Sequence, residues 1–160
     1  IRLSFLIFPT VSLSLQKISI LARLIGIDYG KKRVGIAVTD PLKIGASGLT
    51  TVASNEALDF LAEYLNREEV ECIVVGKPVQ MNNTASESFI YVKQFVAALK
   101  RRFPEKRIEL MDERFTSKMA VRTMINGGMK KSQRRKKENI DKISAAILLQ
   151  SFLEQETNNN

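Results

Sequence analysis

The sequence contains no histidine and only one cysteine among its 160 residues. Without histidine the chain cannot build a Ser-His-Asp triad, a Cys/His zinc site or an imidazole acid-base pair. Cys72 has no second cysteine for an intramolecular disulfide, and since it lies in the apolar run 72–75 we expect a buried structural thiol. Any metal chemistry would therefore use carboxylate oxygens, which suit magnesium or manganese.

The first residues lack both a regular pattern and a long apolar run. Within residues 1–22, polar residues and Pro9 interrupt the apolar stretch too often for a bilayer-spanning helix. We expect a disordered extension or a translation-start artefact. A secretory signal is the alternative, although no typical cleavage site precedes residue 24. One domain over 23–153 and a polar tail over 154–160 should follow, in a cytoplasmic protein without a membrane partner.

Positive charge is concentrated in one region. The net charge is +8, and residues 100–137 contain 14 Lys and Arg against 4 Asp and Glu. Such a basic block is typical of a protein that binds a phosphate backbone, and a solvated basic face is the alternative. We expect nucleic-acid contacts from cations in a turn, in the basic stretch and at two strand ends: Lys31, Lys32, Arg33, Lys77, Arg114, Lys130, Lys131, Arg134, Arg135, Lys136 and Lys137.

The order of apolar runs predicts an α/β fold. Residues 24–40 comprise two apolar runs joined by Tyr29–Lys32, which is typical of a β-hairpin, and further strands are expected over 49–53, 71–75 and 108–113. Helices should begin at Ser54 or Asn55, run from Thr84 to Pro104, and cover 116–126 and 139–152, with a basic loop over 129–137. This order predicts a mixed five-stranded sheet with helices on both faces, in which strands 1–3 are antiparallel and strands 1, 4 and 5 are parallel.

Three acidic positions could meet at one edge of this sheet. Asp28 follows the first strand, Glu113 (or Asp112) follows the fifth, and Asp141 lies in the first turn of the last helix. Converging carboxylates stay ionised when a cation lies between them, so we expect a magnesium site. Two such ions could activate a water and stabilise the leaving oxygen in phosphodiester hydrolysis. Glu138, one helical turn before Asp141, could supply a fourth ligand.

Each acid also has a purely structural explanation. Asp28 could accept backbone hydrogen bonds in the turn, Asp112 and Glu113 could pair with nearby cations, and Asp141 could complement the helix dipole. Their joint placement beside a basic block favours the site.

Four segments in order resemble the YqgF (RuvX) family: Ile27–Gly30 with Arg33–Ala37, Val74–Pro78, Asp112–Thr116 and Ile140–Ala146. The resemblance implies an RNase H-like fold related to Holliday-junction resolvases, and a nuclease that matures the 5′ end of pre-16S ribosomal RNA. It places Asp28, Glu113 and Asp141 on the acidic positions that hold the metals. Lys77 and Asn82-Asn83 depart from the family's common residues, which bears on substrate detail more than on the chemistry.

We therefore predict a Mg²⁺- or Mn²⁺-dependent endonuclease, a hydrolase of phosphodiester bonds that acts on a ribosomal RNA precursor as a monomer or homodimer. A junction-cutting DNA nuclease and a non-catalytic ribosome assembly factor are the alternatives. A sugar- or nucleotide-phosphate enzyme is a third, since Asp28–Gly30 is also similar to the phosphate loop of actin- and hexokinase-like ATPases. Those enzymes use two such domains, and 160 residues leave no room for a second.

Overall fold

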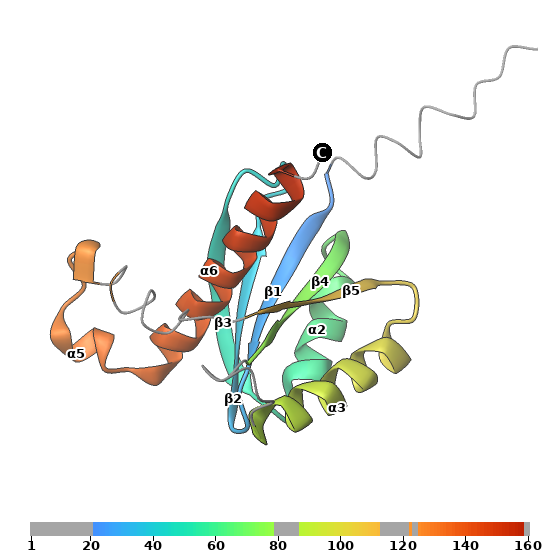
Figure 1. The fold of residues 1–160 in the computed structure, drawn as a ribbon, viewed down its shortest axis with the longest axis horizontal. Helices are drawn as coiled ribbons and strands as arrows, with labels where there is room; N and C mark the ends of the chain where they lie inside the picture. Colours follow the sequence, from blue (N-terminus) through green and yellow to red (C-terminus); the bar gives the residue numbers. More distant parts are fainter. Residues whose placement is uncertain (1–20, 79–86, 113–121, 123–124, 159–160) are drawn as a thin grey trace, which may run out of the picture.

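The computed structural model describes residues 21–78, 87–112, 122 and 125–158 (Figure 1). The expected extension, apart from its last two residues, the helix start at Thr84 and most of the helix expected over 116–126 lie outside this part. The described elements are β1 (Arg23–Tyr29), β2 (Arg33–Thr39), β3 (Ala46–Ala53), α2 (Ala57–Leu65), β4 (Val70–Lys77), α3 (Glu87–Arg102), β5 (Arg107–Asp112), α5 (Lys131–Arg134) and α6 (Lys137–Asn158).

The five strands form one sheet in the order β3-β2-β1-β4-β5. β1 pairs antiparallel with β2, and β2 pairs antiparallel with β3. β1 pairs parallel with β4, and β4 pairs parallel with β5. The predicted mixed sheet is therefore confirmed, and the carboxyl ends of β1, β4 and β5 share one edge of it.

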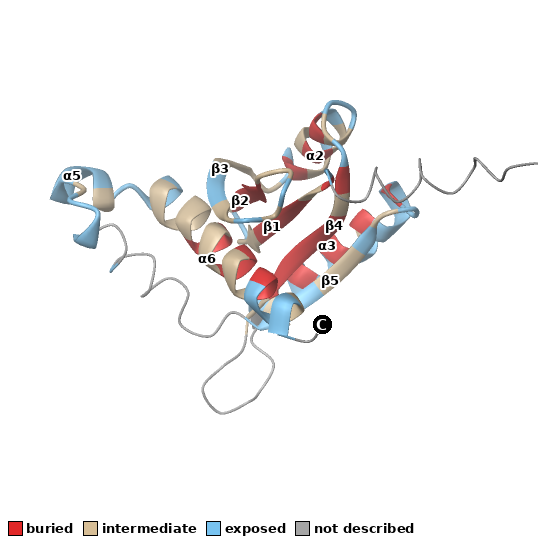
Figure 2. Cartoon of the chain, turned by 90° about the horizontal axis from the view of Figure 1, so that it is seen from above, coloured by how far each residue is buried: buried red, intermediate tan, exposed pale blue. Residues whose placement is uncertain are grey.

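Helices cover both faces of this sheet (Figure 2). Because successive strand residues point to opposite faces, Ile25 and Ile27 pack with α2 and α3, whereas Leu24 packs with α6. Cys72 belongs to the α6 side, is fully buried, and has its pKa raised to about 12 by that burial. It is the structural thiol that the sequence predicts.

Two helices near the carboxyl end differ from the sequence prediction. The basic stretch expected as a loop contains the single turn α5, which forms because the Gln133 and Arg134 amides donate to the Lys130 carbonyl. α6 continues to Asn158, through much of the expected tail. Its last turns are held by an ion pair from Arg107 to Glu156 and by the Thr157 hydroxyl. The periodicity of apolar residues reveals neither the backbone hydrogen bonds that form α5 nor the ion pair that holds the end of α6, so the sequence prediction missed both.

The start of α2 also differs, since Glu56 rather than Ser54 or Asn55 is the residue before the helix. The Ser54 hydroxyl donates instead to the Gly30 carbonyl at 2.7 Å. Ser54 therefore ties the end of β3 to the β1–β2 turn. β3 itself begins at Ala46, three residues before the predicted strand over 49–53.

Candidate active site

Glycines bring α6 into direct backbone contact with the sheet. A Cβ atom on Gly26 would lie 2.7 Å from Leu149 Cβ, and one on Gly35 would lie 2.1 Å from the Asp141 carbonyl oxygen. Real Cβ atoms essentially never come closer than 3.0 Å to such atoms. The helix therefore reaches the strands at these points because no side chain intervenes.

This contact brings two of the predicted acids together. Asp28 shares a sheet face with Leu24, which packs with α6, and its direct partner on β2 is Gly35. Asp141 lies over the same glycine from the helix side. Both acids are half-buried. Asp28 and Asp141 thus flank one glycine at the edge of the sheet where β1 ends.

The face of α6 that carries Asp141 is the one that the sequence predicts to point inward. Ala145, Leu148 and Phe152 continue this face and are all buried. Thr51 fixes the start of the helix over the edge strand, because its hydroxyl donates to the Glu138 carbonyl at 2.8 Å. The Glu138 residue itself is exposed. The first turn of α6 is therefore anchored on β3 while Asp141 lies over β2.

Arg33 forms an ion pair with one of these two acids, Asp141. Arg33 Nε donates to Asp141 Oδ2 at 2.9 Å, and the two side chains are 36% and 25% exposed. Arg33 is the first residue of β2 and was expected to contact phosphate. Sequence reasoning did not foresee this ion pair, because 108 residues separate the two partners. Arg33 neutralises part of the charge that Asp28 and Asp141 would otherwise concentrate.

Asp112 lies on the opposite face of the sheet from Asp28. It shares its strand face with Ile108, which packs with the α2 and α3 side, and it is paired in register with Lys77. The Lys77 ammonium lies 3.9 Å from Asp112 Oδ1. Of the two acids that the sequence leaves open, Asp112 is thus directed away from Asp141. Glu113 and Arg114 lie outside the described residues.

The described acids, Asp28 and Asp141, are of the ligand type that a hard divalent cation prefers. Among residues 21–78, 87–112, 122 and 125–158, no three His, Cys, Asp or Glu side chains form a group that could hold a metal ion. Asp28 and Asp141 both lie next to Gly35, and Asp and Glu oxygens are the ligands that Mg²⁺ and Mn²⁺ prefer. A third ligand would have to come from outside the described residues, as the sequence expectation for Glu113 requires.

Most of the expected phosphate-binding cations fall into two groups. Lys31 and Lys32 are exposed in the β1–β2 turn, after Asp28, Tyr29 and Gly30. The second group surrounds α5 and leads into α6, whose first turns hold Asp141 (Figure 1). Its exposed members are Lys130, Lys131, Arg135, Lys136 and Lys137, and Arg134 is half-buried.

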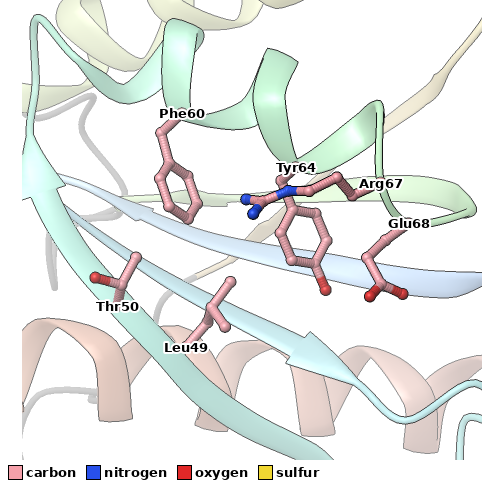
Figure 3. A pocket seen from close by; sticks show the side chains of 6 residues that line it. All are labelled: Leu49, Thr50, Phe60, Tyr64, Arg67 and Glu68. Carbon is pink, nitrogen blue, oxygen red and sulfur yellow. The ribbon is translucent and has the colours of Figure 1, made fainter.

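A pocket lies elsewhere, between β3 and α2 on the face opposite α6 (Figure 3). Its volume is about 330 Å³, and it is lined by Leu49, Thr50, Phe60, Tyr64, Arg67 and Glu68. Burial raises the pKa of the Tyr64 hydroxyl. The pocket contains one carboxylate and does not include Asp28 or Asp141, so it is separate from the acidic site.

Comparison with known proteins identifies the family. The profile of the RuvX family, described as Holliday junction resolvase, matches residues 22–155. The chain belongs to the RuvX family. Relatives called "Putative pre-16S rRNA nuclease" include one from Bacteroides thetaiotaomicron, 52% identical over 134 residues, which are 84% of this chain and 97% of that protein. Another, from Christiangramia forsetii, is 50% identical over 133 residues, which are 83% of this chain and 98% of that protein.

Solved structures agree with the RNase H-like fold that the resemblance implies for the RuvX family. RuvC from Thermus thermophilus superposes with a TM-score of 0.54 at 18% identity, over 85% of this chain and 96% of RuvC. T. thermophilus RuvC in complex with a Holliday junction substrate superposes with a TM-score of 0.52 at 19% identity, over 84% of this chain and 96% of that RuvC chain. The identity is too low to transfer a substrate, so this likeness concerns the fold.

Proposed function

We propose that this protein is a metal-dependent endonuclease that processes the 5′ end of the 16S ribosomal RNA precursor. The observation that carries the proposal is that Asp28 pairs with Gly35 in the sheet and that the Asp141 backbone lies over the same glycine, at the edge where the parallel strands end. Sites in open α/β sheets characteristically lie at this edge. The names of the half-identical relatives support the choice of substrate.

Asp28 and Asp141, together with Glu113 as the sequence predicts, would hold Mg²⁺ or Mn²⁺. A metal held there supplies a Lewis acid that activates water and stabilises negative charge on the leaving oxygen. Asp28 is held in position by strand pairing with Gly35, and Asp141 is held by the contact of the α6 backbone with the same glycine. Arg33 donates a hydrogen bond to the Asp141 carboxylate, so a metal ion would compete with this guanidinium for the carboxylate.

The exposed cations at this edge would hold the phosphate backbone of the substrate. Lys31 and Lys32 follow Asp28 in the β1–β2 turn, and the segment around α5 leads into the helix that carries Asp141. Contacts to phosphate position a substrate without reading its sequence, and they make affinity fall steeply with salt. Binding that persists unchanged into high salt would contradict this role for the cations.

A second candidate function is cleavage of branched DNA. The description of the family as Holliday junction resolvase favours it, and the acidic site would serve either nucleic acid. A resolvase needs two active sites on one junction, so a stable homodimer would favour it and a monomer would favour RNA processing. For the RNA-processing function we propose a cytoplasmic location, where precursor ribosomal RNA is processed. Within the described residues, no helix is long and apolar enough to cross a membrane.

The test is a cutting assay with purified full chain. The substrates are a precursor fragment spanning the 5′ end of 16S ribosomal RNA and a four-way DNA junction, each with and without Mg²⁺ or Mn²⁺. Metal-dependent cutting of the RNA that is lost in Asp28→Asn is the expected result. Asp59→Asn on α2 is the control, because its side chain is 75% exposed on the other face of the sheet.

Two results would overturn the proposal. Cutting of the junction alone would favour the resolvase function. Salt-sensitive binding without cutting of either substrate, unchanged in Asp28→Asn, would favour a non-catalytic ribosome assembly factor.

A further inference from the structure

Aromatic rings and lysines gather beside the acidic edge, on the α3 side of the sheet. The Lys31 ammonium lies 5.2 Å from the centre of the Tyr91 ring. Lys77 and Lys93 lie 5.5 Å and 4.9 Å from the centre of the Phe89 ring. These five residues form the aromatic–lysine surface. They come from the β1–β2 turn, the end of β4 and the first turns of α3, which lie next to one another in Figure 1.

Packing fixes this surface relative to Asp28. Tyr29, the next residue after Asp28, stacks on Phe95 with ring centres 4.3 Å apart and an angle of 24° between the rings. Phe95 is buried, and Tyr91 lies four residues before it, on the same side of α3 one turn earlier. The stack therefore anchors α3 against the end of β1 and places Tyr91 over the turn that follows Asp28.

The Tyr91 ring is accessible. The residue is 38% exposed, and the neighbouring Ile90 is 60% exposed. The contact between Lys31 and Tyr91 stabilises the fold only slightly, because an exposed cation–π contact shifts the folding equilibrium only about 2- to 5-fold. Stacking of a nucleobase on an aromatic side chain contributes more, about 5- to 140-fold in affinity. A base can therefore displace Lys31 from the ring, and the ammonium can then pair with an adjacent phosphate.

We infer that the aromatic–lysine surface binds unpaired nucleotides of the substrate strand next to the acidic site, with one base stacked on Tyr91. Lys31 and Lys93 contact the phosphates on either side of that base. The surface selects single strands, because a base within a duplex is already stacked and cannot offer a free face to Tyr91. This inference rests on the proposed function, for which it specifies the substrate as a strand with unpaired bases beside the cut.

The test measures binding without cutting, by fluorescence anisotropy of labelled probes in EDTA. The probes are an oligouridine of about ten nucleotides, an abasic strand with the same number of phosphates, and a blunt-ended RNA duplex, which should bind Tyr91→Ala and the unmodified protein equally because it offers no unpaired base. Tyr91→Ala should bind oligouridine about 5- to 140-fold more weakly than the unmodified protein and bind the abasic strand equally well. Tyr91→Phe keeps the ring and should retain the affinity, and Ile90→Ala is the matched control on the same helix.

Lys31→Ala should weaken binding to oligouridine and to the abasic strand by the same factor, and it should lower the salt dependence by about one charge. The inference is overturned if Tyr91→Ala binds oligouridine as the unmodified protein does, or if it weakens the abasic strand equally. The outcome is independent of cleavage. If Asp28→Asn still cuts RNA, the proposed function is wrong. The binding titrations still decide separately whether Tyr91 stacks on a base.

Discussion

Replacing Gly35 with alanine should separate α6 from the sheet. The new Cβ atom would lie 2.1 Å from the Asp141 carbonyl oxygen, 2.3 Å from the Asp141 carbonyl carbon and 2.9 Å from the Lys142 nitrogen. All three are backbone atoms, so no side-chain rotation relieves the contact. To lengthen 2.1 Å to at least 3.0 Å, the helix must retreat from β2 by about 0.9 Å. This movement also disturbs the buried contacts of Ala145 and Leu149.

The expected loss of stability is at the upper end of the range for overpacked cores, about 3 kcal/mol. For a domain of this size, that corresponds to a fall in Tm of about 6–12 °C. Thermal melting followed by circular dichroism measures it, and calorimetric titration with Mn²⁺ should show weaker binding because Asp141 moves with the helix. Gly45→Ala is the control, because the nearest atom to its Cβ would be Gln150 Oε1 at 4.0 Å. If Gly35→Ala melts at the same temperature as Gly45→Ala, the helix does not lie on this glycine as described.

Two further predictions concern single side chains. Removing Arg33 frees Asp141 from an ion pair that is partly exposed, so Arg33→Ala should bind Mn²⁺ up to about fivefold more tightly in calorimetry; weaker binding would mean that Arg33 supports the metal site. Burial raises the pKa of Cys72 to about 12 from 9.0, so the folded thiol should resist Ellman's reagent at pH 8 and react on denaturation. Rapid labelling of the native protein at pH 8 would contradict a buried Cys72. Because the pKa of this thiol is higher in the folded state than in the unfolded state, the free energy of unfolding should also fall as pH rises from about 9 towards 12.

Much of the fold could be predicted because it depends on local patterns. Apolar runs and a glycine-containing turn indicated the hairpin, and connection lengths indicated which strands run parallel. The inward face of α6 followed from its periodicity, which placed Asp141 in line with Ala145 and Leu148. The expectation that Asp28 and Asp141 would meet depended only on these elements and on the usual site of open α/β sheets.

What the sequence could not provide depends on contacts between distant segments. Gly35 is unremarkable in the sequence, since its importance comes from a helix that begins about a hundred residues later. The Arg33–Asp141 pair has the same origin. The direction of Asp112 depends on strand register with β4, which a list of residues does not contain. The pocket at Tyr64 likewise arises from two elements whose packing leaves space between them.

The central claim is that Asp28 and Asp141 act as one site. The most direct test compares metal-dependent cutting rates of the 16S precursor fragment for Asp28→Asn, Asp141→Asn and the double variant, with Asp112→Asn as the control on the opposite face of the sheet. Residues that act as a unit are strongly non-additive, so each single variant should lose cutting and the double variant should be no worse than either. Asp112→Asn should cut at close to the unmodified rate. Undiminished cutting by Asp28→Asn or Asp141→Asn, or losses that multiply in the double variant, would contradict the account.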